Sequence, residues 1–99
     1  MPTKDYKPQL LTRLKNPEYS VAYLCEVLEN ESQEAFLIAL RNVIDAREES
    51  LADLATRIGV TRQGLHKLLS ANGNPRLSTL NELLKAMGMK IQISREAAA

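Results

Sequence analysis

The chain has little of several residue types, and each shortage excludes a class of protein. Its 99 residues include a single cysteine, which excludes an intrachain disulfide and a metal site built on a cysteine cluster. Tryptophan is absent and phenylalanine occurs once, so the core must be mainly aliphatic. No apolar run approaches the roughly 20 residues that span a bilayer, and the N-terminus lacks the apolar stretch of a signal peptide. The length of the chain predicts a single domain. The shortages predict that this domain is cytoplasmic and holds no metal.

The residue patterns of common enzymes are also missing. The chain has one histidine, no glycine-rich phosphate-binding loop, no pair of histidine ligands and no serine nucleophile elbow. Cys25 lies in an apolar stripe among acidic neighbours, which would not stabilise a thiolate. We therefore interpret Cys25 as a core residue rather than a nucleophile, and we expect a protein that is not an enzyme and needs no cofactor.

The net charge of +1 conceals an uneven distribution of charge along the chain. Residues 18–53 contain nine acidic residues and only two arginines. Residues 54–81 contain no acidic residue, and their basic residues are Arg57, Arg62, Lys67 and Arg76. Because phosphates repel carboxylates and attract basic side chains, the second segment is the one suited to nucleic acid. Chance clustering of surface charge is the alternative explanation.

Residues 51–69 predict two short helices joined by a tight turn. Apolar residues spaced three and four apart give the first helix one buried face. Gly59 is expected to end it, because glycine readily adopts the left-handed conformation, and Thr61 to cap the next helix. The small Ala55 would let the two helices cross closely, as a helix-turn-helix requires, with Leu65 as the inner anchor. An ordinary helical hairpin in an all-α core is the alternative.

Polar side chains on the outer face of the second helix suit the major groove of double-stranded DNA. Arg62 can donate two hydrogen bonds to a guanine edge, and Gln63 can pair with an adenine edge. His66 lies further along the same face, although a purely solvated role is equally open to it. The remaining candidates are expected to contact phosphates, and they are Arg57, Thr61, Lys67, Asn74 and Arg76.

The other elements follow from periodicity and from proline. Residues 1–16 carry basic side chains interrupted by prolines, which predicts an extended or partly ordered arm that reaches DNA or packs on a partner. A floppy basic tail is the alternative. Residues 17–99 form the single domain, with further helices expected over residues 17–29, 30–48 and 77–87. In the first of these helices, the expected apolar stripe is Val21, Leu24, Cys25 and Leu28.

A short strand is expected near the C-terminus. Met89, Ile91 and Ile93 alternate with polar residues, a period of two that is typical of a strand over residues 89–94. A lone strand is not stable in a helical domain, so the favoured partner is the same strand of a second copy. The sequence thus predicts a homodimer, with an extended tail packed on its own core as the alternative.

Two known families share these patterns. Residues 52–69 resemble the Xre/Cro-type helix-turn-helix of phage repressors through Leu54-Ala55, Gly59-Val60-Thr61 and Leu65, although Leu51 stands where many members carry Gln or Ser. Residues 34–93 resemble, more narrowly, the HigA-like addiction-module antidote proteins, or antitoxins. The matching segments are FLIA at 36–39, LHKLLS at 65–70, GNP at 73–75, STL at 78–80 and LKAMGM at 84–89, preceded by an N-terminal match over residues 10–29. His66 departs from this family, which often has Tyr there.

The resemblance implies a five-helix, lambda-repressor-like fold with N-terminal helices. It also implies a dimer that binds an operator beside its own gene and represses its own operon. The second implied partner is a cognate small basic toxin of the RelE/HigB type, which the antitoxin would neutralise. The acidic residues in 18–53 would then face the toxin. Two alternatives stay open, an Xre-family transcriptional regulator without a toxin partner and a helical protein-interaction module.

Overall fold

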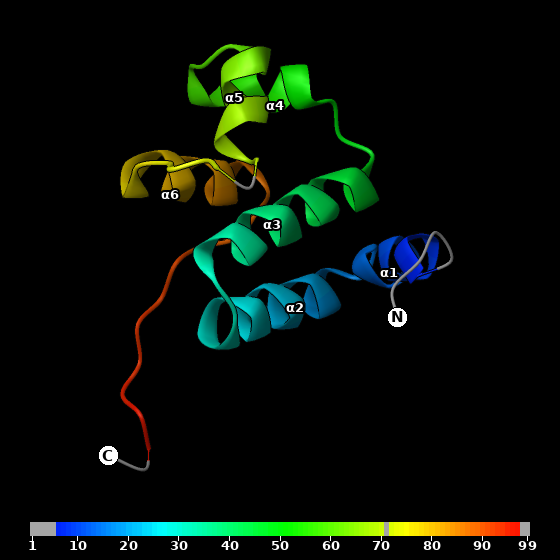
Figure 1. The fold of residues 1–99 in the computed structure, drawn as a ribbon, viewed down its shortest axis with the longest axis vertical. Helices are drawn as coiled ribbons and strands as arrows, with labels where there is room; N and C mark the ends of the chain where they lie inside the picture. Colours follow the sequence, from blue (N-terminus) through cyan, green and yellow to red (C-terminus); the bar gives the residue numbers. More distant parts are fainter. Residues whose placement is uncertain (1–5, 71, 98–99) are drawn as a thin grey trace.

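The computed structural model describes residues 6–70 and 72–97, and this part of the chain contains six helices (Figure 1). The helices are α1 (Tyr6–Leu14), α2 (Pro17–Asn30), α3 (Gln33–Arg47), α4 (Leu51–Ile58), α5 (Arg62–Leu68) and α6 (Leu77–Ala86). Helix α3 lies at the centre, with α1 and α2 on one side and the α4–α6 group on the other. The predicted all-α class is confirmed, but the described residues form six helices instead of five.

Side-chain caps determine where the central helices begin. The hydroxyl of Ser32 accepts a hydrogen bond from the backbone N–H of Ala35 at 3.1 Å, and Ser50 caps α4 in the same way. Each cap satisfies one of the free N–H groups at a helix start. Asn30 lies at the end of α2, where its amide donates to Glu26. The chain therefore turns between α2 and α3 before Ser32 starts the second of these helices.

One aliphatic core joins the two sides of the molecule. Leu40, Val43 and Ile44 of α3 are at most 2% exposed, and they share this core with Leu54 of α4 and Leu65 of α5. The interior thus consists mainly of leucine and β-branched side chains, as the scarcity of aromatic residues predicts. Because α3 is covered on both sides, it has seven buried residues, whereas α2 has two.

The extended or partly ordered arm expected over residues 1–16 includes a regular helix, because Tyr6–Leu14 form α1. Leu10 and Leu14, one helical turn apart, are 6% and 1% exposed and anchor α1 to the core. Pro8 is tolerated because it lies in the first turn, where a backbone N–H has no helical partner. The Lys7 ammonium lies 3.5 Å from the Asp45 carboxylate, so this basic residue faces α3. Residues 1–5 of the arm lie outside the described residues.

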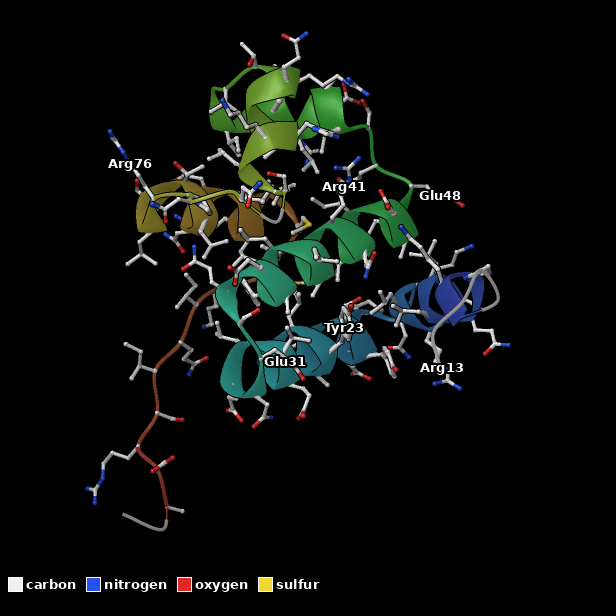
Figure 2. The ribbon with its side chains drawn as sticks, viewed as in Figure 1. Arg13, Tyr23, Glu31, Arg41, Glu48 and Arg76 are labelled. Carbon is white, nitrogen blue, oxygen red and sulfur yellow. The ribbon has the colours of Figure 1, made fainter. Side chains whose placement is uncertain are left out.

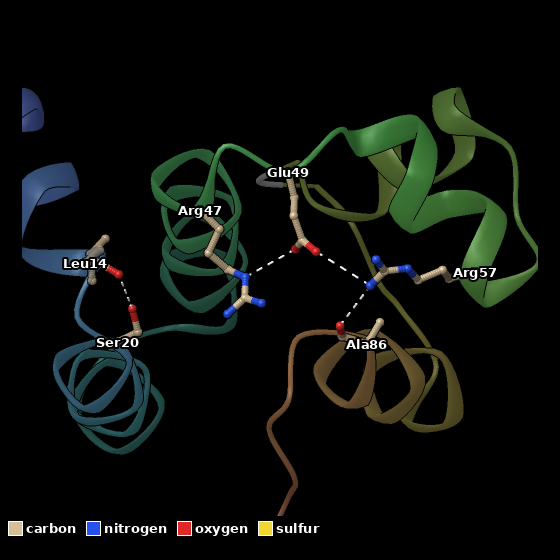
Figure 3. Close-up of polar contacts among 6 residues, drawn as sticks. All are labelled: Leu14, Ser20, Arg47, Glu49, Arg57 and Ala86. Carbon is tan, nitrogen blue, oxygen red and sulfur yellow. Dashed lines mark hydrogen bonds and ion pairs between the residues drawn. The ribbon is translucent and has the colours of Figure 1, made fainter.

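Helix α2 buries a different face from the one predicted. Of the expected stripe, Leu24 is buried, whereas Val21, Cys25 and Leu28 are exposed. The interpretation of Cys25 as a core residue is therefore wrong. The buried side instead includes Ser20, whose hydroxyl donates to the Leu14 carbonyl at 2.6 Å and ties α2 to the end of α1 (Figure 3).

The predicted C-terminal strand is not observed in the single chain. Residues 89–96 follow α6 without any regular secondary structure, and Figure 1 shows them running away from the helices as an extended segment. Ile91 and Ile93 are 43% and 93% exposed. The alternative of a tail packed on its own core is therefore wrong for these two side chains. A strand needs a neighbouring strand to complete its hydrogen bonds, and the described part of one chain offers none.

Candidate nucleic-acid interface

Helices α4 and α5 are joined by a turn of three residues. Gly59 adopts the left-handed conformation at φ 80°, and its N–H bonds to the last carbonyls of α4. The next N–H, from Val60, donates to the Ala55 carbonyl at 2.9 Å. Ala55 is 1% exposed, and α5 crosses α4 at close range at one end of the molecule (Figure 1). The predicted turn and its left-handed glycine are confirmed, and Ala55 is buried.

Thr61 begins α5 as predicted. Its hydroxyl accepts a hydrogen bond from the Gly64 N–H at 2.9 Å. A Cβ atom at position 64 would lie 2.9 Å from the same hydroxyl oxygen, so a glycine leaves room for the cap. This contact gives a structural reason for a glycine inside a short helix, where it otherwise costs stability.

The outer surface of α5 is polar and is not covered by other parts of the chain within residues 6–70 and 72–97. Arg62, Gln63, His66 and Lys67 are all exposed. Among the described residues, none of these four side chains forms a hydrogen bond or an ion pair. We call these four residues the α5 outer face. Their donors and acceptors are therefore available to an external ligand.

Arg57 is placed differently from the α5 outer face. Its guanidinium Nη1 lies 3.5 Å from the Glu49 carboxylate and donates to the Ala86 carbonyl at 3.1 Å (Figure 3). Glu49 also contacts Arg47 at 3.2 Å, so one carboxylate joins the end of α3 to α4. The Arg57 side chain thus stabilises the packing of α4 against α6. The charge pattern alone offered no sign of these internal partners.

The loop between α5 and α6 carries the two remaining predicted residues. Asn74 is exposed, and its amide oxygen accepts a hydrogen bond from Gln33 Nε2 at 3.5 Å, at the start of α3. Arg76 occupies the N-cap position of α6 and is exposed (Figure 2). Gly73 lets the loop turn tightly, because a Cβ there would lie within 2.0 Å of the Leu68 carbonyl oxygen. The loop is therefore packed against the end of α5.

The ion pairs of the described residues leave the α5 region without counter-charges. All of them use a carboxylate from Asp45, Glu48 or Glu49. Arg62, Lys67 and Arg76 have no such partner in the part of the chain that the structure describes, and residues 54–81 contain no acidic residue. The surface around α5 therefore carries positive charge that the fold itself does not neutralise.

The described residues contain neither a membrane-spanning helix nor a cluster of metal-ligating side chains. No helix there is long and apolar enough to cross a membrane. No group of three His, Cys, Asp or Glu side chains there is placed to hold a metal ion.

The fold and its surfaces define a small, all-helical protein with an exposed basic helix. A family model described as "Probable addiction module antidote protein" matches residues 6–95. The chain belongs to this family of antidote proteins, which gives it an antitoxin role and a toxin as partner. Membership of an antidote family also points to a regulatory rather than a catalytic protein.

The chain is also similar to an uncharacterised protein of Haemophilus influenzae (strain ATCC 51907 / DSM 11121 / KW20 / Rd). The two are 33% identical over 96 residues, which cover 97% of this chain and 95% of the relative. No solved structure matches the chain.

Proposed function

We propose that this antitoxin is a sequence-specific DNA-binding protein that represses its own operon and neutralises a small basic toxin of the RelE/HigB type. The observation that carries the DNA-binding part is the α5 outer face, whose four exposed polar side chains have no hydrogen-bond or ion-pair partner among the described residues. Helix α5 is joined to α4 by a tight turn, and this geometry supports the proposal of a helix-turn-helix of the Xre type. Such a protein acts on operator DNA in the cytoplasm.

The side chains divide into two roles. Arg62 and Gln63 are proposed to read base edges in the major groove, with His66 further along the helix. The residues proposed to contact phosphates are Arg57, Thr61, Lys67, Asn74 and Arg76. Arg57 must exchange its contact with Glu49 for a phosphate, and Thr61 must contact DNA while its hydroxyl caps α5.

A binding titration tests these roles with DNA from upstream of the gene and a scrambled duplex of equal length, at two salt concentrations. We expect Arg62→Ala to reduce the preference for the upstream DNA by about 1–3 kcal/mol, because a bidentate contact to guanine is lost. Lys67→Ala should weaken binding to both duplexes equally and reduce its salt dependence. Lys85→Ala, an exposed lysine on α6, is the matched control and should change neither.

Two results would contradict the assignment. Wild-type protein that binds neither duplex at low salt would remove DNA binding from the proposal. An Arg62→Ala variant that keeps the full preference for the upstream DNA would show that another side chain reads the bases.

We also propose that residues 89–94 pair with the same segment of a second copy. The exposed Ile91 and Ile93, on one side of an extended backbone, support this homodimer. Sedimentation at increasing protein concentration should show a dimer for the wild type, and Ile93→Asp should shift it towards monomer, because the charge would lie on the apolar face of the paired strands. Leu77→Asp, at a residue that is 70% exposed on α6, is the control. A wild-type protein that stays monomeric throughout would refute the dimer.

A further inference from the structure

Helix α2 has an exposed apolar stripe that the fold does not use. Val21, Cys25 and Leu28 are spaced four and three residues apart, so they lie on one side of the helix. Val21 is 46% exposed and Leu28 is 63% exposed, and the Cys25 side chain between them is exposed as well. An exposed stripe of this kind marks an interaction surface more often than an isolated apolar residue does.

The packing of α2 is complete without this stripe. Ser20 and Leu24 are buried on the neighbouring side of the helix, and Tyr23 and Val27 pack against the same core. The Tyr23 hydroxyl also accepts a hydrogen bond from the Asn42 amide of α3 at 3.1 Å. The exposed stripe is therefore left free once α2 has docked on α3.

Carboxylates border the stripe. At 100° per residue, Glu18 and Glu29 lie next to Cys25 around the helix axis, on the exposed side. Residues 16–40 contain five glutamates and no lysine or arginine. In the described part of the chain, none of these five takes part in an ion pair, whereas Asp45, Glu48 and Glu49 are all paired. We call the residues Glu18, Val21, Cys25, Leu28 and Glu29 the α2 outer face.

We propose that the α2 outer face is the docking site for the toxin, through a toxin surface with an apolar centre and a rim of lysine or arginine. This inference rests on the antitoxin role described above. A second copy of this chain is disfavoured as the occupant. A symmetric contact would bring the same patch of each protomer together, and with it glutamate against glutamate. A basic partner instead gains both apolar burial and charge complementarity.

The docking site is separate from the proposed DNA interface. Helix α2 lies on one side of α3, and α5 lies on the other side at the far end of the molecule (Figure 1; Glu31 and Arg76 mark the two regions in Figure 2). Variants of the α2 outer face should therefore leave DNA binding unchanged. DNA binding can serve as the control for correct folding of each variant.

The single cysteine of the chain provides a test without mutation. The probe is the purified protein encoded by the reading frame beside this gene. Cys25 should react with a maleimide in the free antitoxin, and saturating probe should slow that reaction at least about tenfold because the thiol becomes covered. Operator DNA should not slow it. A reaction rate unaffected by a probe that binds would place the toxin elsewhere and overturn the inference.

Two double variants separate the apolar and the charged contributions. Glu18→Lys with Glu29→Lys, and Val21→Ser with Leu28→Ser, should each weaken binding of the probe at least about tenfold. The matched controls are Glu82→Lys and Leu77→Ser, both at exposed positions of α6, and they should bind as the wild type does. If the wild type binds and both double variants bind equally well, the docking site is wrong but the antitoxin proposal stands. If the wild type itself does not bind the probe, the proposed toxin partner fails.

Discussion

Leu65→Ala is expected to lower the free energy of unfolding by about 2–5 kcal/mol, the usual cost of removing a buried leucine side chain. Leu65 is 0% exposed and joins α5 to the shared core. The substitution leaves a cavity between α5 and the shared core, which the neighbouring side chains fill only in part. Against a total stability of about 5–15 kcal/mol for a domain of this size, the loss is large. Urea denaturation followed by circular dichroism measures it directly.

The same substitution at an exposed site provides the control. Leu77 is 70% exposed at the first position of α6, so Leu77→Ala should change the unfolding free energy by less than about 0.5 kcal/mol. Equal losses at Leu65 and Leu77 would contradict the assignment of Leu65 to the core. At temperatures where Leu65→Ala is still folded, the α5 outer face should remain in place and bind DNA.

Gly73→Ala is expected to destabilise the protein by about 1–3 kcal/mol or more, because the new methyl group would overlap backbone atoms. Its Cβ would lie 2.0 Å from the Leu68 carbonyl oxygen and 3.0 Å from the Lys67 carbonyl oxygen. Neither atom belongs to a flexible side chain, so the loop and the end of α5 must move apart. Thermal unfolding should show a lower Tm, and DNA binding should weaken if the loop positions Asn74 and Arg76.

A comparison with Gly59 separates steric overlap from backbone strain. Gly59 has a positive φ, but a Cβ there meets nothing within 4 Å. Asparagine tolerates the left-handed conformation better than alanine does, so Gly59→Asn should be less damaging than Gly59→Ala. At Gly73 both substitutions should be damaging, since both add the same Cβ. Recovery of stability by Gly73→Asn would contradict the steric explanation.

The sequence predicted best those elements whose signals are local. Gly59 and Thr61 set the end of α4 and the start of α5 through their own backbone and hydroxyl chemistry, and both were predicted correctly. The inner face of α3 was equally clear, because Leu40 and Ile44 are buried whichever helix packs on them. Such signals need no knowledge of the neighbouring elements.

The errors came from choices that depend on distant partners. Helix α2 carries two overlapping stripes, and both have helical spacing. Periodicity cannot tell whether Leu24 is buried with Val21 and Leu28 or with Ser20 and Val27. The choice is made by α1 and α3, through the Leu14 carbonyl and the Asn42 amide. The buried side of α2 could have been considered from the sequence, because Ser20, Tyr23, Leu24 and Val27 also have helical spacing.

Among the candidate DNA-contacting residues, some positions follow from local helical spacing and others depend on distant partners. The exposure of Arg62, Gln63, His66 and Lys67 follows from the helical spacing that buries Leu65. The internal contacts of Arg57 do not follow from spacing, because Ala86 lies 29 residues away and Glu49 lies in the linker before α4. Base contacts themselves stay predictions until a complex with DNA is measured.

Added salt should change the DNA affinity of this protein without changing its folding stability. The ion pairs of the described residues are exposed or partly exposed to solvent, so each contributes about 1 kcal/mol or less. No buried polar side-chain atom of the described residues lacks a hydrogen bond. The core is aliphatic, so screening by added electrolyte leaves the main stabilising interactions intact. A loss of DNA binding at high ionic strength can then be assigned to phosphate contacts rather than to unfolding. The slope of the logarithm of the binding constant against the logarithm of the salt concentration would then report the number of phosphate contacts.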